Sequence, residues 1–147
     1  MNKLFVAGES WSGLILRVSL GVVMLPHGAQ KLLGWFGGPG FSVAMAGFTD
    51  KMHIPAPLAV AVIAAESFGA LGLIVGLCTR IAAFGILCDM IGAIALVHWH
   101  NGFFMNWAGT QAGEGFEYHL LAIAVSLVLL IAGAGRWSLD RLIADRF

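Results

Sequence analysis

Two closely spaced histidines are the residues whose spacing most directly suggests chemistry. His98 and His100 lie in the stretch VHWHNGFFMNW, just after a long apolar run. Such a pair could bind a metal or a haem iron, contact a redox-active molecule, or form the polar edge of a buried segment. If the stretch continues as a helix, the two imidazoles point about 200° apart and should not bind one ion together. We therefore assign no metal site.

Three ionisable residues, Arg17, Glu66 and Asp89, interrupt apolar runs. At the centre of a membrane helix each would cost on the order of 2.5–3.5 kcal/mol, so each should face other helices and be paired. Glu66 and Asp89 come out at similar depth when about 1.5 Å of helix is counted per residue. The side chains of Arg17 and Asp89 should point toward the same membrane surface. We therefore expect a structural charge pair between them, or an Arg17 side chain that reaches the interface.

Helical spacing places several polar residues on the same faces as glycines, where helices can approach closely. This pattern predicts a polar pocket inside a helix bundle, open toward one membrane surface. The alternative is a charge-paired core with a purely structural role, and we assign no catalytic residue. The pocket candidates, which could bind a cofactor, are His27, Lys31, Glu66, Asp89, His100, Glu117 and His119.

The composition indicates that a membrane positions these residues. Hydrophobic residues make up 59% of the 147 residues and charged residues 11%, and the mean hydropathy is +0.89. So little charge could not cover the surface of a water-soluble domain. Four segments are long enough to cross a bilayer, at about 11–33, 56–77, 80–99 and 116–134. We expect an all-α bundle of four transmembrane helices that forms one membrane domain over residues 1–147.

Shorter elements are predicted at two places. The apolar stretch Phe41–Phe48 follows a glycine-rich break and is too short to cross, so it should form an interfacial or re-entrant helix. The sequence SLD at residues 138–140 resembles a helix start and predicts a short amphipathic helix over Leu139–Phe147. Cys78 and Cys88 lack the spacing of a redox or zinc motif and are interpreted as small apolar fillers.

The flanking cations predict the orientation. Lysine and arginine are more frequent on the side that carries both termini, so both termini should be cytoplasmic. All five histidines then fall at or near the outer face. The net charge is formally zero and no basic run occurs, which excludes nucleic acid as a partner and leaves the lipid bilayer. The cations expected on the cytoplasmic side are Lys3, Arg80, Arg136, Arg141 and Arg146, and those expected on the outer side are Lys31 and Lys51.

Four stretches, taken in order, resemble the DoxX family of small four-helix bacterial membrane proteins. They are LRVSLGVVMLPHGAQKLL, ESFGALGLIVGLCTR, NGFFMNW and GFEYHLLAIAVSLVLLIAGAGRWSLDRL. The resemblance implies a multi-pass protein of the bacterial inner membrane. Founding members of the family look like subunits of quinone-linked systems, and other relatives are similar to partners of detoxification enzymes. The resemblance carries no catalytic signature, and catalysis by this chain alone is not implied.

Three functions are consistent with these observations. The first is a redox-associated subunit that binds a quinone, or a similar aromatic or sulfur substrate, in the outward-facing pocket and works with a soluble or membrane redox partner. The second is a haem- or metal-binding bundle, with His27 opposite His100 or His119. The third is a non-catalytic anchor or scaffold for a soluble oxidoreductase or detoxification enzyme. A homo-oligomer is compatible with each.

Overall fold

The first long helix, α1 (Trp11–Leu33), begins and ends at residues suited to helix ends. The computed structural model describes residues 10–146. The Ser10 hydroxyl accepts a hydrogen bond from the Gly13 amide at 3.3 Å, which satisfies an amide that has no partner inside the helix. Gly34 follows the helix with a φ of 73°, the left-handed conformation that glycine adopts without strain. The helix thus has the predicted bounds.

The second and third long helices each contain a π turn, in which hydrogen bonds span five residues instead of four. The second runs over Ala56–Val75 and the third over Thr79–Asn101, close to the predicted spans. Their parts are α3 (Ala56–Ala64), the π turn η3 (Ala65–Gly69) and α4 (Ala70–Val75), then α5 (Thr79–Ala93), the π turn η4 (Ile94–His98) and the 3-10 turn η5 (Trp99–Asn101).

The fourth apolar helix, α6 (Glu117–Ala132), is shorter, with 16 residues. By length and composition, three helices of the described chain could cross a membrane: Trp11–Leu33, Ala56–Val75 and Thr79–Asn101. Together with the shorter α6 they form an all-α membrane bundle, as the sequence predicts. No strand occurs between residues 10 and 146.

Short helices occur at both places where the sequence predicts them. After the 3-10 turn η1 (Trp35–Gly37), α2 (Gly40–Ala46) continues into the π turn η2 (Gly47–Lys51). Helix α7 (Leu139–Ala144) begins at Ser138, whose hydroxyl accepts from the Arg141 amide. The helix ends at Ala144, three residues before its expected end at Phe147, and both Phe147 and Lys3 lie outside the described residues.

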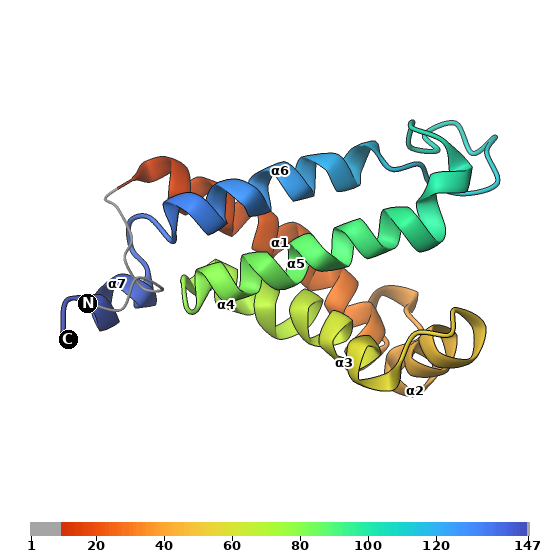
Figure 1. Cartoon of the computed structure of the whole chain (residues 1–147), viewed down its shortest axis with the longest axis horizontal. Helices are drawn as coiled ribbons and strands as arrows, with labels where there is room; N and C mark the ends of the chain where they lie inside the picture. Colours follow the sequence, from red (N-terminus) through yellow and green to blue (C-terminus); the bar gives the residue numbers. More distant parts are fainter. Residues whose placement is uncertain (1–9, 147) are drawn as a thin grey trace.

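The two ends of the bundle differ (Figure 1). Helix α7 and the first turn of α1 lie at one end, called here the α7 end. Helix α2 and the segment 102–116 lie at the opposite end, called here the loop end. Along the bundle α1 packs against η3 and α4, and α5 packs against α6 and η3. The small residues Ala70, Ala82, Ala83 and Ala122 in the core allow these close contacts.

The outer surface of the bundle is apolar, whereas several charged side chains are buried. Ile131 is 79% exposed and Leu121 is 69% exposed, while Arg17, Glu66 and Asp89 are buried. This arrangement is the reverse of a water-soluble helix bundle, which turns its apolar stripe inward. It is the arrangement expected where lipid covers the outside.

Arg17 is not paired with Asp89, and the expected charge pair is corrected by the structure. All five N–H groups of its guanidinium donate to main-chain carbonyls, so no donor remains for a carboxylate. These carbonyls belong to the last turn of α4 and to the segment after α6. Nε bonds to Ala134 at 2.9 Å, one Nη to Leu73 at 2.9 Å and to Ile74, and the other Nη to Arg136 at 3.1 Å and Trp137 at 2.6 Å.

The segment after α6 also caps the third long helix. The Asp140 carboxylate accepts from the amides of Cys78 and Thr79, at 2.6 and 2.8 Å. A carboxylate at a helix N-terminus satisfies free amides and interacts favourably with the helix dipole. The C-terminal segment therefore closes the α7 end of the bundle.

Candidate functional site

An ion pair joins the first and second long helices inside the bundle. Lys31 Nζ lies 2.6 Å from Glu66 Oε2, and the side chains are 24% and 6% exposed. The pair forms because α1 and η3 touch backbone to backbone at Gly28. A Cβ atom at Gly28 would overlap the Glu66 carbonyl, so only glycine fits there. Lys31, almost one turn further along α1, then reaches the Glu66 carboxylate.

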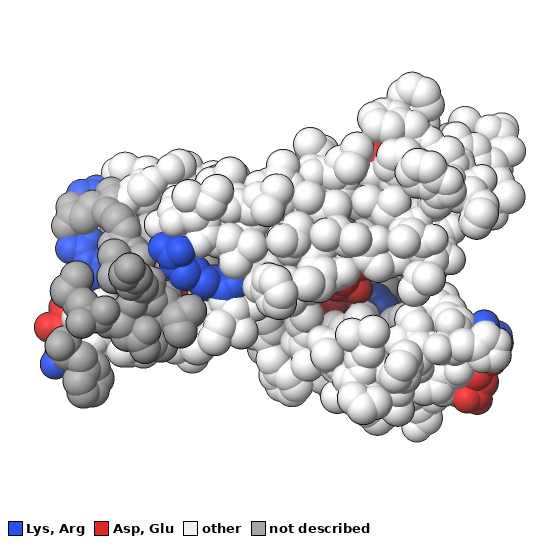
Figure 2. Space-filling view, in the orientation of Figure 1, with Lys and Arg blue, Asp and Glu red and all other residues white. Residues whose placement is uncertain are grey.

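Asp89 adds a third charged group from a third helix. Its carboxyl is buried on α5 and interacts directly with the Glu66 carboxyl. It also interacts electrostatically with the Lys31 ammonium group. Figure 2 shows acidic and basic atoms in a hollow between the helices, on the side of the bundle's middle that is nearer the loop end. We call Lys31, Glu66 and Asp89 the charged cluster. The structure thus brings together three of the seven residues that the sequence predicts to line a pocket.

His27 and Tyr118 lie beside the charged cluster. Their ring centroids are 6.4 Å apart, and the Tyr118 hydroxyl contacts the Met24 sulfur at 3.5 Å. His27 interacts electrostatically with both Lys31 and Glu66. The sequence reasoning missed Tyr118. It is the only tyrosine of the chain and stands at the start of an apolar helix, which was the available signal.

A pair of histidines lies next to this group, toward the loop end. The rings of His98 and His119 are 4.1 Å apart, and His119 also contacts Tyr118 at 5.6 Å. His119 is buried, as expected for a pocket residue. The Nδ1 atom of His98 lies 2.8 Å from the Glu114 carbonyl, which links the pair to the segment 102–116.

Two expected pocket residues lie elsewhere. His100 is exposed in η5, whereas His98 faces the bundle. The π turn η4 inserts one extra residue into the helix and so rotates the following side chains by about 100°. Glu117 holds the segment 102–116, because its carboxylate accepts from the Met105 amide at 2.9 Å and the Trp107 indole at 3.4 Å.

No group of three or more His, Cys, Asp or Glu side chains between residues 10 and 146 is arranged to hold a metal ion. Of the residues expected to hold a haem, His100 is exposed in η5 and His119 contacts the ring of His98. The arrangement instead offers hydrogen-bond donors and protonatable carboxyls at the edge of a hollow. Such a set of groups can bind a polar head group and exchange protons with it.

Comparison with known proteins identifies the family. The model of the family described as DoxX matches residues 12–99, which is more than half of the chain. The chain is a member of the DoxX family. The matched segment of this DoxX protein contains the whole charged cluster, together with Arg17 and His27. Tyr118 and His119 lie beyond it.

Two curated proteins resemble this DoxX chain along most of its length. "Uncharacterized membrane protein Rv3486" of Mycobacterium tuberculosis is 30% identical over 146 residues, covering 92% of this chain and 83% of that protein. "Putative oxidoreductase CatD" of Bacillus subtilis is 30% identical over 129 residues, covering 88% and 83%. No solved structure matches.

Proposed function

We propose that this DoxX protein is a redox-associated membrane subunit that binds a quinone, or a similar aromatic or sulfur-containing molecule, at the charged cluster. The observation that carries the proposal is the convergence of Lys31, Glu66 and Asp89 from three helices at the edge of a hollow. Buried charges inside a membrane bundle are costly and mark functional sites by default. The name of the relative CatD, which describes an oxidoreductase, also supports it.

Each group has a role in this proposal. Lys31 and His27 donate hydrogen bonds to a ligand oxygen, and the Glu66–Asp89 pair exchanges protons with it. Lys31 balances the charge of Glu66, with which it forms the ion pair. Reduction of a quinone to the quinol takes up two electrons and two protons. Both electrons come from a redox partner, and the carboxyls pass on the two protons, each of which is replaced from water.

A second candidate is a membrane anchor for a soluble enzyme. It is favoured by the exposed side chains at the α7 end, where Trp137 is 75% and Leu142 59% exposed. In both proposals the protein lies in the bacterial inner membrane with both termini in the cytoplasm, because the flanking cations favour that side. A soluble partner would then dock at the α7 end.

Thermal unfolding of the purified protein in detergent, with short-chain ubiquinone and menaquinone analogues, tests the first candidate. We expect the analogues to raise the unfolding temperature of the wild type and of His100→Ala, since His100 is exposed. Lys31→Met and Asp89→Asn should lose this response. Failure of every analogue to stabilise the wild type would overturn quinone binding and favour the anchor.

A further inference from the structure

The second and third long helices separate toward the loop end, just beyond the charged cluster. Nearer the α7 end they touch, because a Cβ atom at Gly69 would lie 3.7 Å from the Cβ of Ala82. A Cβ atom at Gly85 would likewise lie 3.1 Å from the Cβ of Ala65. Gly92 follows Gly85 by two turns of α5 and lies within about 20° of the same face. Among the described residues, nothing lies within 4 Å of a Cβ atom at Gly92, so the contact has ended at this level.

The facing surface of the second helix is uncovered at the same level. Ala61 and Leu58 follow Ala65 toward the loop end, one and two turns away on nearly the same face. Ala61 is exposed and Leu58 is 56% exposed. The hollow of Figure 2 lies here, between α3 and α5, with acidic and basic atoms inside it. We call the space bounded by Leu58, Ala61 and Gly92 the interhelical gap.

The interhelical gap combines a charged base with apolar walls. Asp89 is three residues from Gly92 on α5, and Glu66 follows Ala61 on the second helix, so both carboxyls lie at the α7 side of the gap. The Lys31 side chain, which pairs with Glu66, is 24% exposed. The three wall residues are apolar and offer a surface to hydrocarbon. A ligand that matches this arrangement has a polar head group and an apolar body.

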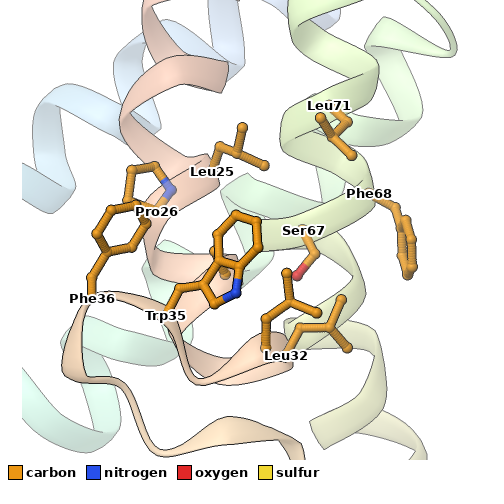
Figure 3. Close-up of a pocket in the computed structure, with 10 residues that line it drawn as sticks. Leu25, Pro26, Leu32, Trp35, Phe36, Ser67, Phe68 and Leu71 are labelled. Carbon is orange, nitrogen blue, oxygen red and sulfur yellow. The ribbon is translucent and has the colours of Figure 1, made fainter.

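A second groove, between α1 and the second helix, lacks the charged base. Figure 3 shows the rings of Trp35 and Phe36 beside Leu25 and Pro26 of α1, with Phe68 on the second helix. None of the described residues that line this groove is charged. It therefore offers no charged partner to a head group, whereas the interhelical gap does.

We propose that the interhelical gap admits a membrane-dissolved amphiphile, whose polar head group binds at the charged cluster and whose apolar body lies along Leu58, Ala61 and Gly92. The proposal rests on the proposed function and narrows its ligand to lipid-soluble molecules, because a water-soluble sulfur compound gains nothing from apolar walls. The gap lies on the flank of the bundle, where lipid covers the apolar surface. A ligand dissolved in the bilayer therefore reaches the charged cluster sideways, without passing through the segment 102–116.

Spin labels test whether the interhelical gap opens into lipid. A nitroxide is attached at Gly92→Cys, in the full chain with Cys78 and Cys88 replaced by alanine, in lipid vesicles. Dissolved oxygen collides with labels in lipid, whereas a water-soluble nickel chelate collides with labels in water. Ile91→Cys, at a neighbouring position that is 53% exposed, is the lipid reference, and Thr110→Cys is the water reference. We expect the label at Gly92 to behave like the label at Ile91. Behaviour like that at Thr110, or collisions with neither reagent, would overturn the proposal.

A bulky side chain in the interhelical gap tests binding itself. Gly92→Phe fills the gap without a clash at its Cβ atom, because nothing described lies within 4 Å of that position. Ile91→Phe places the same ring on the adjacent exposed position and is the matched control. Thermal unfolding with decylubiquinone compares the two variants. We expect Gly92→Phe to lose the rise in unfolding temperature and Ile91→Phe to keep the rise seen in the wild type.

Two other results separate this proposal from the proposed function. If Gly92→Phe responds like the wild type while Asp89→Asn does not, the ligand reaches the charged cluster by another path. That result would overturn the interhelical gap as the entrance and leave the proposed function intact. If decylubiquinone and the other quinone analogues do not stabilise the wild type, quinone binding at the charged cluster fails, and the present proposal fails with it.

Discussion

At the scale of single residues, Arg17 shows how a cation can be buried without a carboxylate in direct contact. Its five donors meet five carbonyls, two in the last turn of α4 and three in the segment after α6. The two α4 carbonyls lie at the C-terminal end of a helix, where the helix dipole is negative. The guanidinium is therefore surrounded by main-chain oxygens that accept its hydrogen bonds in an apolar environment.

Arg17→Lys should destabilise the bundle although it keeps the charge. An ammonium group has three donors, so at least two of the five carbonyls lose their partner. We expect a loss of about 3 kcal/mol in the free energy of unfolding, measured by denaturation in detergent. Arg146→Lys, at an exposed position, is the matched control and should unfold like the wild type. Equal stability of the two variants would contradict the account of Arg17.

The ion pair of Lys31 and Glu66 can be tested by a double-mutant cycle. Either Lys31→Met or Glu66→Gln alone leaves a buried charge without its partner and should lower stability by about 3 kcal/mol or more. The double variant removes both charges and should recover part of the loss. Thermal unfolding of the four proteins gives the coupling energy. Additive losses would mean that the pair is not formed in solution.

The partners of these residues could be predicted from the sequence only in part. That Glu66 and Asp89 are buried and adjacent follows from their depth in apolar segments. The partners of Arg17 could not be predicted in this way. They are main-chain carbonyls, which occur in every sequence and carry no side-chain signal. Tyr118 was missed for a similar reason, since a single tyrosine in an apolar helix is usually a packing residue.

At the scale of helices, the π turn η4 explains why His98 faces the bundle and His100 does not, the reverse of the predicted faces. The helix bounds could be predicted to within a few residues from apolar length and glycine positions. The face of each residue was then calculated at about 100° per residue, which holds only for an uninterrupted α-helix. The turn η4, whose last residue is His98, breaks this rule. His98 turns inward to His119 and His100 outward.

Alanine variants of these two histidines test the rotated face. His98→Ala removes the contact with His119 and the link to the Glu114 carbonyl, so the segment 102–116 should exchange its amide hydrogens faster. His100→Ala should leave exchange unchanged, because its side chain is exposed. Hydrogen exchange followed by mass spectrometry measures both. Faster exchange only in His100→Ala would show that the uninterrupted helix is correct.

The contact of α1 with η3 depends on Gly28. Gly28→Ala places a methyl group against the Glu66 carbonyl and should separate the helices, at a cost of about 1–3 kcal/mol. Gly47→Ala is the control, because nothing lies within 4 Å of a Cβ at that position. It should be neutral or slightly stabilising. Circular dichroism during heating compares the two variants, and an unaffected Gly28→Ala protein would contradict the backbone contact.

At the scale of the whole molecule, the two ends of the bundle have different constructions. Arg17 and Asp140 close the α7 end through main-chain groups, whereas the charged cluster and the histidine pair lie toward the loop end. The sequence predicted the bundle itself because composition and segment length suffice for that. It could not predict how the segment after α6 folds back, because that depends on contacts more than a hundred residues apart.

The orientation predicts which end a membrane-impermeant reagent reaches. In a variant with Cys78 and Cys88 replaced by alanine, Thr110→Cys at the loop end should react with an impermeant maleimide in intact cells. Asp145→Cys at the α7 end should react only after the membrane is permeabilised. Gel mobility or mass spectrometry measures the labelling. The reverse pattern would place both termini outside.

The five bonds of Arg17 also set an order of events during synthesis. The carbonyls of Leu73 and Ile74 are 56 and 57 residues later in the chain, and those of Ala134, Arg136 and Trp137 are 117 to 120 residues later. The first helix thus enters the membrane with an arginine whose final partners have not yet been made. Until the segment 134–137 has been made, the Arg17 guanidinium lacks three of the five carbonyls that accept its hydrogen bonds.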